Sequence, residues 1–168
     1  MKNIVLIGMP GCGKTTFGKK LAKALGRKFW DADGVLVERE KRSIKSFFAE
    51  SENAFREAET RTLKYLAGMS GAVIATGGGA VLREENMACF SANADVIFLD
   101  RSPKIIIDSI VDDSRPLLAA DKENIYKLYE ERISLYRKYA DVIVDNNGSS
   151  SDTYEELVCQ WDRLRDEE

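Results

Sequence analysis

Five short apolar runs alternate with longer stretches of helical periodicity along this chain. The runs are Ile4–Ile7, Lys28–Trp30, Ala72–Thr76, Val96–Asp100 and Val142–Asp145. Runs of this length, separated by amphipathic segments, are typical of parallel strands that helices cover on both faces. The pattern therefore predicts an α/β fold in three layers, with a five-stranded parallel sheet between helices.

The segments between the runs predict helices with recognisable ends. Helical stretches are expected at Phe17–Leu25, within the charged region Val35–Leu66, at Lys122–Tyr139, and near the end of the chain through Leu164. Ser43 or Ser46 is a candidate N-cap within the charged region, and Asp152 or Thr153 is one for the final helix. Three aromatic residues are expected in the core rather than as a base-stacking platform: Phe47, Phe48 and Phe55.

The residues that follow the strands point to one edge of the sheet. Glycine or aspartate stands at the ends of these runs, notably at Gly8, Asp31 with Asp33, Gly77 and Asp145. Ligands of open parallel sheets bind outside the carboxyl ends of the strands. We therefore expect the functional side chains along that edge.

Length and composition narrow the class of protein. A chain of 168 residues without repeats or a linker is expected to form one domain, and a net charge of −3 does not favour a nucleic-acid partner. The sequence predicts neither a signal peptide nor a membrane span. Cys12, Cys89 and Cys159 are interpreted as free thiols in a reducing cytoplasm. With no histidine in the chain, acid–base work falls to carboxylates, lysine, tyrosine or water.

The most specific motif lies between the first strand and the first helix. Gly8–Thr16 reads GMPGCGKTT, which matches the phosphate-binding pattern G-x-x-x-x-G-K-[ST]. Glycines let backbone N–H groups surround a phosphate, and the following helix adds its positive N-terminus. Lys14 can reach the β- and γ-phosphates, and the Thr15 hydroxyl can ligate Mg²⁺. The alternative, a glycine-rich turn that only connects strand and helix, does not explain why every fixed position is filled.

Further motifs follow in a recognisable order. They are Asp-x-Asp at 31–33, Phe-Arg at 55–56, Gly-Gly-Gly at 77–79, Arg-Pro-Leu-Leu at 115–118 and Glu-Arg-x-x-x-Tyr at 131–136. From about Asn3 to Asp145 the chain resembles the shikimate kinases. The resemblance implies a nucleoside-monophosphate-kinase-like fold with strand order 2-3-1-4-5. It also implies transfer of the γ-phosphate of ATP to the 3-hydroxyl of shikimate, in the biosynthesis of aromatic amino acids.

The resemblance also assigns roles to residues. It implies ATP binding by Gly11, Cys12, Gly13, Lys14, Thr15, Thr16 and Arg115, with Lys14, Asp33 and Arg115 as the catalytic groups. It implies substrate binding by Asp33, Arg56, Gly77, Gly78, Gly79 and Arg132. One Mg²⁺ ion would be held by Thr15 and, through water, by Asp31. The expected substrate-binding insert spans about 33–62 and the expected lid about 109–121.

Without the resemblance, several of these residues have simpler explanations. Asp31 and Asp33 can be a helix N-cap and a turn, and Arg56 and Arg132 can be solvated surface arginines. The three glycines can form a flexible loop, and Asp108–Asp121 can be a surface loop instead of a lid.

Three departures from the family pattern are visible. Ser51 stands where many members have glycine, and Asp112 and Asp113 add negative charge to the lid. The adenine-facing arginine expected before the lid is missing from Ile107–Ile110, which leaves the base preference open.

Two other functions share this motif set in part. One is a nucleotide-binding regulatory protein without catalysis, and the other is a kinase of gluconate or nucleotides. The glycine triplet and the Arg56/Arg132 pair favour shikimate over both. We expect a cytoplasmic monomer that binds shikimate and ATP, with no nucleic-acid or membrane partner.

Overall fold

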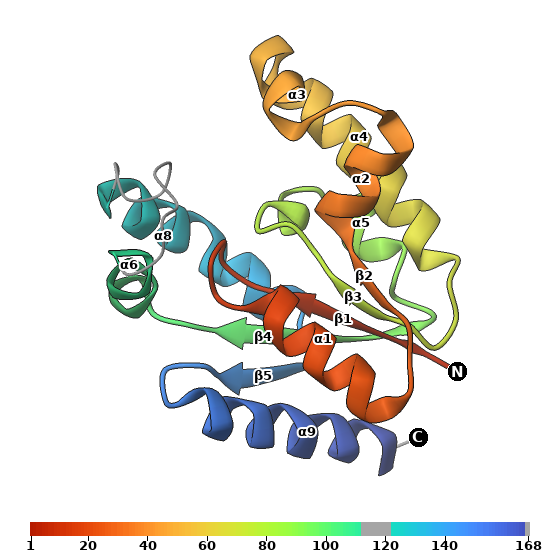
Figure 1. Ribbon diagram of the computed structural model, residues 1–168, viewed down its shortest axis with the longest axis vertical. Coiled ribbons are helices and arrows are strands. Elements are labelled where there is room, and N and C mark those ends of the chain that lie inside the picture. The colour runs from red at the N-terminus through yellow and green to blue at the C-terminus, as the bar shows by residue number, and fades with distance from the viewer. Residues whose placement is uncertain (112–121, 167–168) are drawn as a thin grey trace.

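A five-stranded parallel sheet forms the centre of the protein (Figure 1). The structure is a computed structural model that describes residues 1–111 and 122–166. Its strands follow the order β2-β3-β1-β4-β5, and every neighbouring pair is parallel. Their bounds are β1 Asn3–Ile7, β2 Phe29–Asp31, β3 Val73–Ala75, β4 Ala94–Asp100 and β5 Val142–Asp145. All five predicted strands and the predicted order are confirmed.

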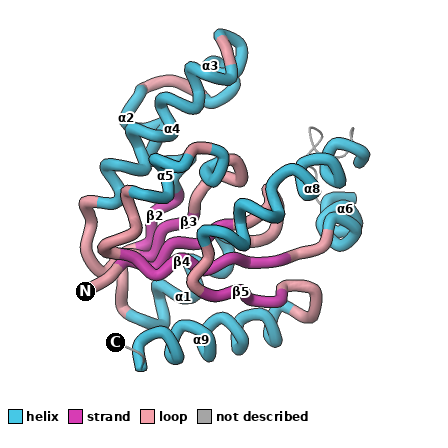
Figure 2. The backbone as a smooth tube through the Cα atoms, turned by 180° about the vertical axis from the view of Figure 1, so that it is seen from behind, coloured by secondary structure: helices cyan, strands magenta, loops and turns pink. Residues whose placement is uncertain are grey.

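Helices cover both faces of this sheet, as the two opposite views show (Figures 1 and 2). Helices α1 (Lys14–Leu25) and α9 (Ser150–Asp166) lie together on one face, where Lys20 sits 3.8 Å above the ring of Tyr154. The other face carries the 3-10 helix η1 (Ala80–Leu82), α5 (Glu84–Ala88) and α8 (Lys122–Tyr139), with α6 (Pro103–Val111) packed beside α8. The three-layer α/β prediction is therefore confirmed.

The core owes its position to the apolar strands. Residues Ile4 to Ile7 of β1, the central strand, are fully buried, as are Val73 and Ile74 of β3. Two aromatic side chains extend this core towards α8, where the rings of Phe98 and Tyr136 stack with centroids 5.0 Å apart. Burial on both faces explains why these strands appear in the sequence as continuous apolar runs.

Three helices project from the sheet as an arm, seen at the top of Figure 1. They are α2 (Ala32–Glu40), α3 (Ile44–Glu50) and α4 (Glu52–Ala67). The arm has a small core of its own, formed by Leu36, Phe47, Phe55 and Ala58. Of the three aromatic residues predicted in the core, Phe48 was placed wrongly, because it is 46% exposed and covers the outer side of Phe55.

The capping residues differ in part from those predicted. Ser43 does cap α3, but Ser46 is the residue whose N–H it accepts, at 3.2 Å. The cap of α9 is Ser149, which accepts from the N–H of Asp152 while the Asp152 carboxylate accepts in return from Ser149. This reciprocal arrangement is a capping box, so the cap lies three residues before the predicted Asp152.

Two predicted segment bounds also shift. Helix α1 starts at Lys14 rather than Phe17, because the helix begins directly in the phosphate loop. The expected lid at about 109–121 begins inside α6, and its residues 112–121 lie outside the described residues. Within the described chain, no helix is long and apolar enough to cross a membrane.

Candidate active site

A cavity of about 460 Å³ opens at the carboxyl edge of the strands. Its wall combines the phosphate loop, the ends of β2 and β3, and the segment after β4. The lining residues are Pro10, Gly11, Gly13, Lys14, Thr15, Thr16, Asp31, Asp33, Thr76, Gly77, Gly78, Arg101 and Ser109. The parallel sheet thus brings together the phosphate loop, the Asp-x-Asp motif and the glycine triplet, as expected from the strand ends.

The phosphate loop has the backbone that an anion-binding turn requires. Gly11 and Gly13 adopt φ angles of 79° and 96°, which side chains other than glycine rarely accept. Gly13 is the N-cap of α1 and offers no side-chain cap, so the first N–H groups of the helix remain available. The Lys14 ammonium donates to the carbonyl oxygens of Gly8 and Met9, at 2.8 Å each. This places a buried cation within the loop.

Thr15 and Asp31 form the part of the site suited to a metal ion. The Thr15 hydroxyl donates to Asp31 Oδ2 at 2.7 Å, while Asp31 Oδ1 accepts from the N–H groups of Asp33 and Gly34. Asp31 is therefore the N-cap of α2, which the sequence offered as the simpler explanation, and it also faces the phosphate loop. A hydroxyl and a carboxylate are oxygen ligands of the kind Mg²⁺ prefers. Among the described residues, no cluster of three or more acidic, histidine or cysteine side chains could hold a metal ion.

Asp33 and Glu59 bring two carboxyl groups into the interior beside Gly77. A Cβ on Gly77 would meet Glu59 Oε1 at 3.0 Å and Asp33 Oδ1 at 3.1 Å. Burial, followed by the charge of Asp31, raises the pKa of Asp33, and burial also raises the pKa of Glu59. Lys14 and Arg56 act on Asp33 in the opposite direction. A carboxylate with a raised pKa can accept a proton from a substrate hydroxyl.

Arg56 is buried rather than solvated. Its Nη1 donates to Glu59 Oε2 at 2.8 Å, its Nη2 lies 3.5 Å from Glu52 Oε1, and its Nε is buried without a hydrogen-bond partner. The guanidinium lies against Gly79 so closely that any Cβ there would collide with it. Arg56 is therefore not the solvated surface arginine of the simpler explanation. The glycine triplet is more than a flexible loop, because the Arg56 guanidinium packs directly against the backbone of Gly79.

Arg132 and Tyr136 approach the same region from α8. Arg132 is buried, its Nε has no hydrogen-bond partner, and its charge acts on both Glu59 and Tyr136. The Tyr136 hydroxyl donates to the carbonyl oxygen of Gly78 at 2.6 Å and lies 3.9 Å from Met9 Sδ. Burial raises the pKa of Tyr136, so the hydroxyl keeps its proton. Arg132 is thus also no solvated surface residue.

Four residues of the site had no role in the sequence analysis: Glu59, Tyr136, Asn146 and Arg101. Asn146 is buried at the end of β5, and its amide donates to the carbonyl oxygen of Cys12 in the phosphate loop. Spacing offered a signal for two of them, because Glu59 lies one helical turn after Arg56 and Tyr136 one turn after Arg132. Of the predicted site residues, Arg115 lies outside the described residues.

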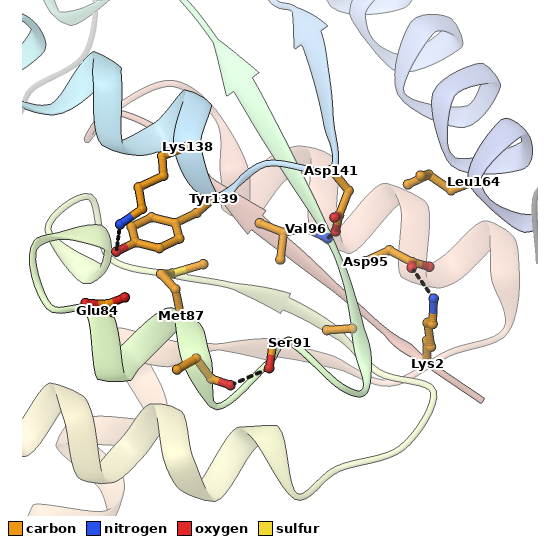
Figure 3. A pocket seen from close by; sticks show the side chains of 12 residues that line it. Lys2, Glu84, Met87, Ser91, Asp95, Val96, Lys138, Tyr139, Asp141 and Leu164 are labelled. Carbon is orange, nitrogen blue, oxygen red and sulfur yellow. Dashed lines mark hydrogen bonds and ion pairs between the residues drawn. The ribbon is translucent and has the colours of Figure 1, made fainter.

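A second cavity, of about 510 Å³, lies at the opposite end of the strands (Figure 3). Its charged side chains already serve the fold: Lys2 pairs with Asp95 at 3.2 Å, and Asp141 accepts from the N–H of Val96 at 2.7 Å. The cavity contains none of the predicted site residues, so the carboxyl edge remains the candidate active site.

Comparison with known proteins agrees with this geometry. Residues 10–161 match the family model described as shikimate kinase. The chain is 42% identical over 158 residues to the shikimate kinase of Clostridium botulinum (strain Eklund 17B / Type B), covering 94% of this chain and 96% of that protein. The chain belongs to the shikimate kinase family. Shikimate kinases phosphorylate the 3-hydroxyl of shikimate with ATP, and this is the activity of the chain.

Solved structures of shikimate kinases have the same fold as this chain. A shikimate kinase from Acinetobacter baumannii in complex with shikimate superposes with a TM-score of 0.87 at 30% identity, covering 98% of this chain and 94% of that one. The shikimate kinase of Aquifex aeolicus gives a TM-score of 0.80, also at 30% identity, with 95% and 96% covered. A gluconokinase from Sinorhizobium meliloti, at 16% identity and a TM-score of 0.72, shares the fold alone.

Proposed function

We propose that the carboxyl-edge cavity performs this phosphoryl transfer with a division of labour between its two ends. The phosphate loop binds ATP through Gly11, Cys12, Gly13, Lys14, Thr15 and Thr16. The other end binds shikimate through Asp33, Arg56, Arg132 and the glycines at 77–79. The observation that carries the proposal is the convergence of Arg56 and Arg132, two buried cations from separate helices, whose charges both act on Glu59, next to Asp33 and Gly77.

Asp33 lies where a base for the acceptor hydroxyl is needed. It lines the same cavity as Lys14, and the buried cation Arg56 acts on its charge. As the acceptor oxygen bonds to the γ-phosphorus and ADP leaves, the hydroxyl proton passes to the Asp33 carboxylate. Phosphoryl transfer requires mainly positioning and charge stabilisation from the protein, which Lys14 supplies at the phosphates. Arg115 is proposed as a further cation on the transferred group.

Thr15 and Asp31 would hold one Mg²⁺ ion, Asp31 through water. Bound with ATP, the ion supplies positive charge to the β- and γ-phosphates. The 2.7 Å hydrogen bond between the two side chains shows that both already face the same point.

We also propose how the chain is divided and where it works. Residues of about 33–62 act as the substrate-binding insert and about 109–121 as the lid. The protein acts as a monomer in the cytoplasm, where its three free cysteines remain reduced.

The arginine pair gives the most direct test of the substrate end. Arg56→Ala and Arg132→Ala should each raise KM for shikimate about 30-fold or more, with KM for ATP within about threefold, because each removes a charge-assisted pair from a buried site. Arg61→Ala is the matched control on α4, since Arg61 is exposed and paired with Glu40. An unchanged shikimate KM in both variants would mean that other residues bind the substrate.

A substrate panel tests the choice of acceptor. With ATP and shikimate, gluconate or a nucleoside monophosphate, ADP should form with shikimate alone.

A further inference from the structure

Arg101 lies in the wall of the cavity, although no motif points to it. It follows the last residue of β4 and lines the cavity together with Lys14, Thr16 and Ser109. Among the described residues, the buried side-chain nitrogens without a hydrogen-bond partner are the Nε atoms of Arg56, Arg101 and Arg132. The first and last of these belong to the proposed substrate end. The Nε of Arg101 is likewise buried without a partner, but Arg101 lies at the end of the cavity that contains the phosphate loop.

An unpaired buried guanidinium nitrogen is unfavourable in a folded protein. Arginine carries five donors, and a buried donor without an acceptor loses its hydrogen bond to water without replacement. The acidic neighbour in sequence does not compensate Arg101, because Asp100 accepts from the Tyr129 hydroxyl at 3.2 Å and lies 4.0 Å from Arg137. No hydrogen bond or ion pair joins the Arg101 side chain to any other described residue.

The backbone around Arg101 is fixed on both sides. The N–H of Ser102 donates to Asn147 Oδ1 at 2.8 Å, and the carbonyl oxygen of Ser102 accepts from the N–H of Ile106 in the first turn of α6. The carbonyl oxygen of Asp100 accepts from the N–H of Asn146. The Cα of Arg101 is therefore held in a defined place beside the cavity, from which its side chain can reach a ligand.

The register of the sheet places Arg101 beside the phosphate loop. Ile7 pairs with Phe98 in the parallel ladder between β1 and β4, and a Cβ on Gly8 would meet the carbonyl oxygen of Leu99 at 2.8 Å. The two strands therefore leave the sheet side by side, one into the phosphate loop and the other into Arg101. Arg101 and the phosphate loop therefore line the same cavity, and a phosphate bound in that loop is the kind of anion a guanidinium recognises.

We propose that Arg101 is a nucleotide-binding residue that donates hydrogen bonds to the phosphate chain of ATP and ADP. The proposal extends the proposed function of the cavity, because it assigns a further cation to the nucleotide end besides Lys14 and the proposed Arg115. Its chemistry is charge-assisted hydrogen bonding from a planar guanidinium to phosphate oxygens.

The test measures ADP binding by calorimetry without shikimate, and KM for ATP and shikimate with both substrates. Arg101→Ala and Arg101→Gln should weaken ADP binding and raise KM for ATP about 10- to 100-fold, with KM for shikimate within about twofold. Arg101→Lys should retain part of the affinity, because it keeps the charge but not the planar fork. Arg137→Ala is the matched control: it removes the same charge near Asp100 from a side chain that is 59% exposed and does not line the cavity.

Two results would overturn the proposal. One is ADP binding in Arg101→Ala and Arg101→Gln equal to that of the parent and Arg137→Ala. The other is an Arg101→Lys variant as weak as Arg101→Ala, which would indicate stacking on the base rather than a phosphate contact. Thermal melts identify a variant that fails to fold, and the remaining substitutions then decide. Because ADP binding needs no shikimate, the test of Arg101 stands apart from a failure of shikimate turnover.

Discussion

At the scale of single residues, the site contains carboxyl groups whose charged form is destabilised by removal from water. Glu59 is buried and Asp33 half-buried beside Gly77, and desolvation raises the pKa of each. Glu59 has the buried Arg56 as its ion-pair partner, at 2.8 Å. Such a pair stabilises little in itself, because desolvation opposes the attraction, but it fixes the direction of the arginine.

Asp33→Asn tests the proposed base at this scale. The variant keeps the size of the side chain but cannot take the proton of the acceptor hydroxyl, so we expect kcat to fall about 10²- to 10⁴-fold. The Kd for ADP should stay within about twofold, because the phosphate loop is untouched. Single-turnover kinetics and calorimetry measure the two effects. A variant with near-parental kcat would remove Asp33 from the chemistry.

Glu59→Gln tests the pH dependence that burial implies. The folded protein keeps the Glu59 proton to a higher pH than the unfolded chain does, since its folded pKa is raised. Its contribution to stability is therefore full below the unfolded value of about 4.3 and is lost as pH rises through the folded pKa. Urea unfolding from pH 4 to pH 8 should show a smaller decline for Glu59→Gln than for the parent. Glu57→Gln, at an exposed position of α4, should follow the parent, and parallel curves for all three proteins would contradict the assignment.

At the scale of elements, helix α8 contacts both the glycine triplet and the phosphate loop. Arg132 and Tyr136 lie one turn apart on it, and the Tyr136 hydroxyl holds the carbonyl of Gly78 while approaching Met9 of the phosphate loop. Gly78 in turn is so close to Pro10 that a Cβ would lie 2.5 Å from its ring. Helix α8 therefore holds the glycine triplet close to the phosphate loop. It also carries Arg132, the cation proposed to bind the substrate.

Tyr136→Phe tests this positioning role. Loss of the hydroxyl leaves the Gly78 carbonyl without its donor, which costs about 1–2 kcal/mol, so kcat/KM for shikimate should fall about 5- to 30-fold. KM for ATP should change less. Tyr129→Phe is the matched control on the same helix, because its hydroxyl donates to Asp100 rather than to the glycine triplet. If Tyr136→Phe and Tyr129→Phe had equal kcat/KM for shikimate, the hydrogen bond to Gly78 would have no specific effect on shikimate turnover.

At the scale of the whole molecule, two cores coexist. The sheet core contains the strands and the helices on both faces, whereas the arm packs Leu36, Phe47, Phe55 and Ala58 separately. Arg56 belongs to the arm, whereas Lys14 and Arg132 belong to the sheet unit. The proposed substrate end therefore spans both cores, and the proposed nucleotide end rests on the sheet core alone. Damage to the arm should therefore affect shikimate binding more than ADP binding.

Phe47→Ala tests this separation. Removing a buried phenylalanine costs about 3–5 kcal/mol, and we expect that loss to loosen the arm while the sheet core stays folded. KM for shikimate should rise about tenfold or more, ADP affinity should stay within about twofold, and amide exchange should quicken within 33–62. The neighbouring Phe48→Ala removes an exposed ring and serves as the control. Equal loss of ADP affinity in Phe47→Ala would show that the molecule responds as one core.

The sequence by itself determined the sheet and the chemistry of the phosphate loop. Apolar runs identify buried parallel strands because both faces exclude water, and the glycine and lysine positions of the loop are dictated by local backbone geometry. The position of Asp31 and Asp33 at the carboxyl edge of the sheet was also predictable, since they follow a strand directly. These signals are local, so a linear pattern contains them.

Only the tertiary structure decided which arginines and carboxylates are buried. Arg56 and Arg132 look like surface residues in their charged helices, and their burial depends on how the arm and α8 meet at the sheet edge. Glu59 and Arg101 belong to no motif: Glu59 lies one turn from Arg56, but its burial beside Gly77 depends on packing, and the Arg101 side chain has no partner among the described residues. Desolvation and pairing are properties of the packed molecule, and spacing along the chain does not encode them.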